Sequence, residues 1–150
     1  MHIYWGALLL FIMLFTLTFP IEKLSYIKNN EVLHYASGIL LLVTFMWQWK
    51  LCIKRYVLRK PSGNDTKSHK FLGTLSMVLY IIHARYIGHN LLYLLSILFI
   101  VAAFIGTFYK LILNLNKKSF SMAWVAMHVF TTTFMIPVIL FHLYTILWFR

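Results

Sequence analysis

Long apolar stretches alternate with short polar or basic joints along this chain of 150 residues. Five stretches are long enough, as helices, to cross about 30 Å of hydrocarbon. They cover approximately residues 4–21, 31–53, 70–88, 91–112 and 122–149. The pattern predicts an all-α integral membrane protein, with residues 1–150 forming a single domain built as a bundle of five transmembrane helices.

The composition points the same way. Hydrophobic residues make up 61% of the chain, charged residues 11%, and only three residues are acidic. A net charge of +11 would suit nucleic acid, but the basic residues lie at the ends of the apolar stretches, where membrane topology places them. We therefore expect membrane lipid, and no nucleic acid, as the partner of this charge.

The basic residues also predict the orientation of the helices. The second and fourth joints hold ten of them, against four on the other side. Because Lys and Arg accumulate in cytoplasmic loops, the N-terminus is predicted to be cytoplasmic and the C-terminus outside. We expect the membrane to be a bacterial inner (plasma) membrane. The basic loop from Lys50 to Lys70 is interpreted as a topology determinant facing anionic lipid, with a docking surface for a cytoplasmic electron donor as the alternative.

Two histidine pairs with the same spacing lie in the third and fifth stretches. His69 and His83 are 14 residues apart, and so are His128 and His142. Fourteen helical residues turn through about 1400°, some 40° short of four turns, and rise about 21 Å. Each pair therefore shares one helix face, with one histidine near each membrane surface.

An imidazole in hydrocarbon needs a partner for its ring nitrogens, and a haem iron supplies one. Two such helices facing each other have the geometry for two stacked bis-histidine haems. The predicted pairs are His69 with His128 at the inner level and His83 with His142 at the outer level. With a single cysteine and no C-x-x-C-H motif, the haems would be b-type.

Several neighbouring residues fit this interpretation. Gly73, one turn after His69, removes a side chain where a porphyrin would lie against the backbone. Arg55 on the inside and Arg85 on the outside are placed to bind haem propionates. The threonines 131–133 could donate hydrogen bonds between the haem levels, and Pro137 should kink or loosen the fifth helix.

The helix order with histidine pairs on the third and fifth helices resembles the transmembrane domain of the ferric reductase and NADPH oxidase superfamily, including the bacterial haem-binding subunit of periplasmic methionine sulfoxide reductase. The resemblance covers residues 31–149 and implies that the four histidines ligate two b haems and pass electrons singly across the membrane. The chain departs from the family in having no sixth helix, and no G-x-G-x-x-G motif occurs. We therefore expect no flavin in this chain and no catalytic residue of its own. It would be the cytochrome b subunit of an oxidoreductase, with a separate redox protein or quinol as donor and an acceptor outside.

His34 leaves alternatives open. It lies four residues before Gly38, repeating the spacing of His69 and Gly73, and it would replace His83 or His142 at the outer haem, contact a quinone, or play an interfacial polar role. Two other function classes also stay open. One is a histidine-based proton or metal transporter. It is disfavoured because the interiors of the five stretches contain no Asp or Glu that could pair with a histidine. The other is a membrane accessory subunit without a cofactor.

Overall fold

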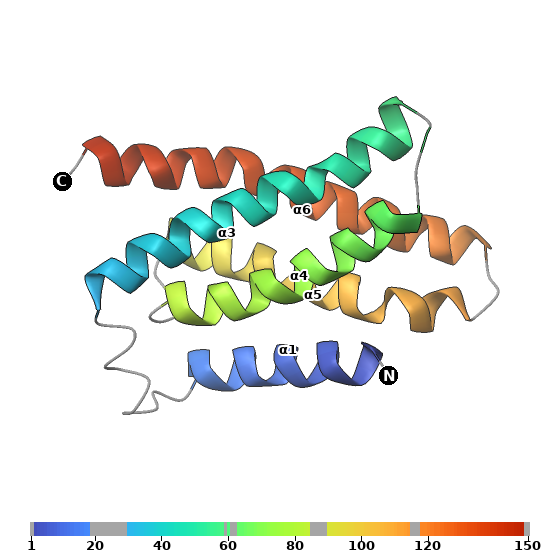
Figure 1. The fold of residues 1–150 in the computed structure, drawn as a ribbon, viewed down its shortest axis with the longest axis horizontal. Coiled ribbons are helices and arrows are strands. Elements are labelled where there is room, and N and C mark those ends of the chain that lie inside the picture. Colours follow the sequence, from blue (N-terminus) through green and yellow to red (C-terminus); the bar gives the residue numbers. More distant parts are fainter. Residues whose placement is uncertain are drawn as a thin grey trace. The chain divides into compact units, whose positions relative to one another are not determined.

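Helices are the regular elements of the described part of the chain. The computed structural model describes residues 2–18, 30–58, 60, 63–84, 90–114 and 118–148, and in these it contains five α-helices and no strand (Figure 1). The helices are α1 (His2–Thr18), α3 (Glu31–Cys52), α4 (Gly63–His83), α5 (Leu91–Leu113) and α6 (Lys118–Trp148), and a π-helical segment, η1 (Ile53–Val57), continues α3.

Three of these helices are long and apolar enough to cross a membrane. They are α3 over Glu31–Lys50, α5 over Leu91–Ile112 and α6 over Lys118–Trp148. Their outward side chains are large and apolar: Leu147 is 81% exposed and Val32 is 77% exposed, which suits lipid better than water. The three long apolar helices and their exposed apolar side chains indicate a membrane protein. In α1 the apolar segment is shorter, Gly6–Thr16, and α4 begins with polar turns, so five spans remain a prediction.

The helix bounds correct one expectation. The basic loop predicted between Lys50 and Lys70 is largely helical, because η1 prolongs α3 and α4 begins at Gly63 rather than near residue 70. Asp65 lies in the first turn of α4, where a carboxylate is stabilised by the helix dipole. Its two oxygens each lie 3.0 Å from Lys54 Nζ. This ion pair joins the end of the α3 segment to the start of α4.

The other bounds agree more closely with the predicted stretches. The predicted ranges 91–112 and 122–149 compare with Leu91–Leu113 and Lys118–Trp148, and the latter helix continues through Pro137. The third predicted helix ends earlier than residue 88, at His83. Residues 85–89, which include Arg85, lie outside the described residues, as do residues 19–29 at the end of the first predicted helix.

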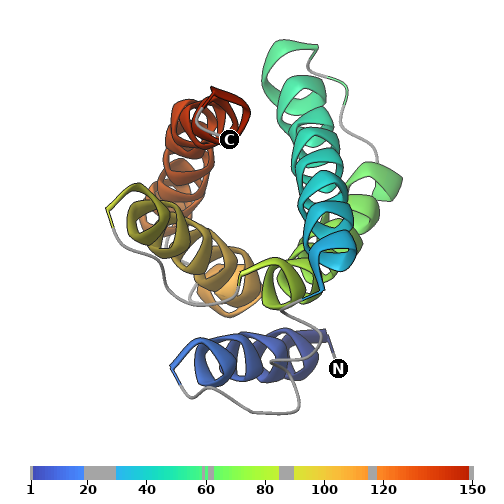
Figure 2. The ribbon, with the colours of Figure 1, turned by 90° about the vertical axis from the view of Figure 1, so that its left-hand side faces the viewer.

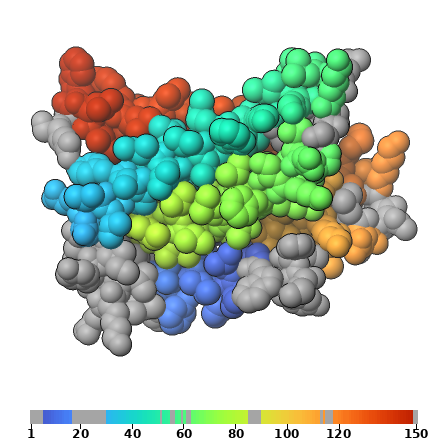
Figure 3. Space-filling model, viewed as in Figure 1, coloured from blue at the N-terminus to red at the C-terminus, as the bar shows by residue number. Residues whose placement is uncertain are grey.

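The chain forms two compact units, residues 8–86 and residues 1–7 with 87–150. In the first unit α3 and α4 pack side by side (Figures 1 and 2), and their surfaces meet in the space-filling view (Figure 3). Contacts join His34 with His83, Thr44 with Ser76, and Lys54 with Asp65. Because residue numbers rise along α3 as they fall along α4, the two helices are antiparallel and in one continuous register.

The second unit contains the pair α5 and α6. Trp124 Nε1 of α6 donates a hydrogen bond of 2.9 Å to the carbonyl of Ile105 in α5. Ile105 of α5 and Met135 of α6 are both buried. The first turns of α1 belong to the same unit, and a Cβ on Gly6 would lie 3.0 Å from Thr107 Cγ2, so Gly6 permits a close approach to α5.

Candidate functional site

His83, the last residue of α4, is held against α3. Its ring stacks on the ring of His34, with centroids 4.4 Å apart and planes 11° from parallel. Its Nδ1 lies 3.0 Å from the backbone oxygen of His34. A carbonyl oxygen can only accept, so Nδ1 is the donor in this contact, and in the neutral ring the lone pair then lies on Nε2. This is the tautomer that binds a metal through Nε2 while its other nitrogen is oriented by a backbone carbonyl.

Gly38 makes room for this ring. A Cβ placed on Gly38 would lie 2.7 Å from His83 Cε1 and 3.0 Å from His83 Nδ1. Such distances are well inside van der Waals contact, so any larger residue would displace the imidazole. Gly38 is one turn after His34 on the same face of α3, so one turn of α3 supplies the carbonyl, the stacking ring and the space.

A polar cluster joins the middle of the same two helices. Gln48 Nε2 donates to Ser76 Oγ at 2.8 Å, and Ser76 Oγ lies 3.2 Å from Thr44 Oγ1. Ser76 and Thr44 are both buried. Hydrogen bonds between apolar helices hold them in register. The cluster therefore fixes the alignment that brings His34 and Gly38 to His83.

Gly73 lies next to this cluster, on the same helix as His69. A Cβ on Gly73 would have a single near neighbour, Gln48 Oε1 at 3.9 Å, which is ordinary contact. The packing of the described residues therefore does not require glycine at this position. His69 itself is half-buried in the second turn of α4.

In the second unit, His128 also lies against a glycine. A Cβ on Gly106 of α5 would be 3.4 Å from His128 Cε1. Trp124, one turn earlier on α6, anchors the same face through its bond to Ile105. The His128 ring is thus placed on the side of α6 that packs against α5.

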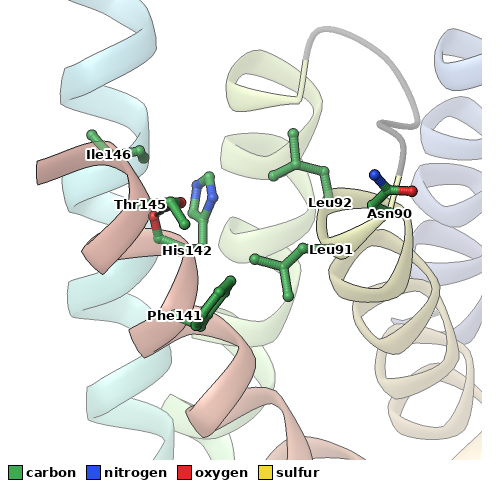
Figure 4. A pocket seen from close by; sticks show the side chains of 7 residues that line it. All are labelled: Asn90, Leu91, Leu92, Phe141, His142, Thr145 and Ile146. Carbon is green, nitrogen blue, oxygen red and sulfur yellow. Dashed lines mark hydrogen bonds between the residues drawn. The ribbon is translucent and has the colours of Figure 1, made fainter. Parts of the chain in front are cut away.

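His142 lines a pocket of about 320 Å³ between the start of α5 and the end of α6 (Figure 4). The pocket is open and mainly apolar. Its lining residues are Asn90, Leu91, Leu92, Phe141, His142, Thr145 and Ile146. Asn90 adopts a positive φ of 54° with ψ −117°, outside the left-handed helical region, and α5 begins directly after it.

The predicted ligands share uninterrupted helices. His69 and His83 both lie within α4, and His128 and His142 both lie within α6. Each predicted haem pair, however, joins residues of different units, so the pairing stays a prediction. Arg55 lies in η1, and Arg85 lies outside the described residues.

The expectation for the threonines 131–133 is corrected in part. The Thr132 hydroxyl bonds to the carbonyls of His128 and Val129, and the Thr133 hydroxyl bonds to that of Val129 at 2.7 Å. These hydroxyl protons are used within α6. They are not available as donors between haem levels.

Sequence reasoning missed the partnerships of the two glycines. It singled out Gly38 by its distance from His34, but the space that Gly38 leaves is filled by His83 of the neighbouring helix. No sequence pattern marked Gly106 as part of a site, because no candidate ligand lies near it in the sequence. Among the described residues, no three of His, Cys, Asp and Glu converge as they would on a metal ion, whereas a haem iron needs only two protein ligands.

Comparisons of the chain with models of protein families, with curated proteins and with solved structures found no match.

Proposed function

We propose that this protein is a transmembrane cytochrome b that passes electrons singly through two b haems, from a cytoplasmic flavoprotein or quinol donor to an acceptor outside. The observation that carries the proposal is the pair of equal histidine intervals, each running along one continuous helix. An interval of 14 residues separates two ligand levels by about 21 Å.

The ligands in the proposal are His69 with His128 for the inner haem, and His83 with His142 for the outer haem. The residues present fit such a group. The His34 carbonyl engages Nδ1 of His83, which in the neutral ring makes Nε2 the ligand nitrogen, and the pocket beside His142 is open and apolar. The haems, when bound, supply reversible one-electron chemistry, while the protein orients the ligands and excludes water.

Gly73 supports the inner site. Glycine destabilises the interior of a helix by about 0.5–1 kcal/mol relative to alanine, and at Gly73 the neighbouring side chains leave room for a Cβ. A porphyrin lying against the helix backbone accounts for the glycine. In this proposal all five helices span the membrane, with the N-terminus inside.

Haem stoichiometry is the direct test. Protein purified with haem supplied during expression should contain about two b haems per chain by the pyridine haemochrome assay, with the spectrum of low-spin bis-histidine iron. Replacing any one of the four ligands with alanine should lower this to about one. His2→Ala is a matched control outside the proposed site and should leave two.

Fewer than about one haem per wild-type chain would contradict the proposal. A second measurement separates the levels. In proteoliposomes, an impermeant reductant added outside should still reduce the outer haem of His69→Ala, but should find no outer haem in His83→Ala. If all four substitutions leave the spectrum unchanged and alter a proton or metal flux instead, the histidines belong to a transport path.

A further inference from the structure

One turn of α3 makes three contacts with the His83 ring. The carbonyl of His34 accepts from Nδ1 at 3.0 Å, the His34 ring stacks at 4.4 Å, and the Gly38 backbone leaves the space that the ring fills. The Ser37 hydroxyl donates to the same carbonyl at 3.0 Å. Ser37 is buried, so this bond lies on the packed side of α3.

We infer that this turn of α3 is a seat that positions His83, with Gly38 and the His34 carbonyl fixing the ring so that Nε2 alone can act as ligand. The inference builds on the proposed function and adds to it the assignment of His34 and Gly38 as positioning residues. His34 is then no ligand itself. Its ring stacks face to face on that of His83, so in this inference it supports the ligand ring and would not itself hold the iron.

Gly38 is the sharper of the two tests. Alanine normally stabilises a helix interior relative to glycine, so Gly38→Ala should not weaken α3 as a helix. Its Cβ would, however, lie 2.7 Å from His83 Cε1. The ring must then rotate away, and rotation breaks the bond from Nδ1 to the His34 carbonyl.

His34 separates the roles of backbone and side chain. The hydrogen bond to His83 comes from the His34 backbone oxygen, so His34→Ala keeps the acceptor and loses only the stacking ring. A positioning role therefore predicts a mild effect. A ligand role predicts the loss of a haem.

The first experiment uses the full chain without haem, labelled with ¹⁵N-histidine in micelles, with the His83 signals assigned by their absence in His83→Gln. The wild type should show His83 protonated at Nδ1. Gly38→Ala should move the proton to Nε2, and Ile39→Ala, at an exposed neighbour, should change nothing. Protonation at Nε2 in the folded wild type overturns the inference without any variant.

The second experiment uses the haem-loaded protein. Gly38→Ala should lower the haem content from about two to about one per chain, and His34→Ala should keep about two. Loss of one haem in His34→Ala makes His34 a ligand and overturns the inference. A wild type that binds no haem but shows the Nδ1 proton at His83, moved by Gly38→Ala, refutes the proposed function and leaves the seat established.

Discussion

The polar cluster between α3 and α4 gives a prediction with a defined magnitude. Ser76→Ala removes the acceptor of the 2.8 Å bond from Gln48 Nε2. It also removes a hydroxyl proton that is shared between the Leu72 carbonyl of the same helix at 2.8 Å and Thr44 Oγ1 of α3 at 3.2 Å. Hydrogen bonds between helices in membranes contribute about 0.6 kcal/mol each on average, with a maximum near 1.7. The loss of one full interhelical bond and one shared contact should destabilise the protein by about 0.6–1 kcal/mol, which is roughly a three- to fivefold change in the unfolding equilibrium.

The assay is reversible unfolding in mixed micelles titrated with SDS. Thr133→Ala is a matched control, because the Thr133 hydroxyl is exposed and bonds only within its own helix, to the carbonyl of Val129. It should change the free energy of unfolding by a few tenths of a kcal/mol at most.

A double variant tests the reasoning more closely. When one partner of a buried hydrogen bond is removed, the other loses its bond as well, whereas removing both together is less costly. Gln48→Leu with Ser76→Ala should therefore cost less than the sum of the two single variants. An additive double variant, or a loss below about 0.3 kcal/mol for Ser76→Ala, would show that this cluster does not hold α3 on α4.

Three further predictions concern single sites. Gly106→Ala should keep both haems, because its Cβ would lie 3.4 Å from His128 Cε1, whereas Gly106→Leu should displace that ring and leave about one haem in the pyridine haemochrome assay. Gly73→Phe should also reduce the content to about one haem while circular dichroism shows unchanged helix content, and full haem content would remove Gly73 from the inner site. Asp65→Asn breaks the pair with Lys54 and should lower the free energy of unfolding by less than about 1 kcal/mol, because a partly exposed ion pair is screened by solvent. Thermal unfolding should show a smaller difference in high salt, and a larger loss that does not depend on salt would contradict a simple ion pair.

The positions of the helices could be predicted from the sequence where apolar residues dominate. Both α5 and α6 begin and end within a few residues of the predicted stretches. The start of α4 could not be predicted in this way, because its first turns, GNDTKSH, are polar and show no apolar run. Asp65 stabilises that start through the helix dipole and through Lys54. The partner of Asp65 is visible only when α3 and α4 lie together.

The candidate site, like the helices, could be predicted from the sequence only in part. The equal spacing of the histidine pairs is a property of the sequence, and the continuity of α4 and α6 preserves it. The contact of His34 with His83 depends on the antiparallel register of two helices, which the polar cluster and the ion pair of Lys54 with Asp65 support. Local patterns do not encode that register. For this reason the H-x-x-x-G spacing located Gly38 but did not identify His83 as the ring that it accommodates.

The two glycine contacts bear on how the proposed haems would be held. His83 rests on Gly38 of α3, and His128 rests on Gly106 of α5. In the proposed pairing, each haem has one of these two histidines and one from the other unit, His142 or His69. A donor that is already oriented loses little conformational entropy when it binds, while the open pocket beside His142 leaves that ring room to adjust to the iron.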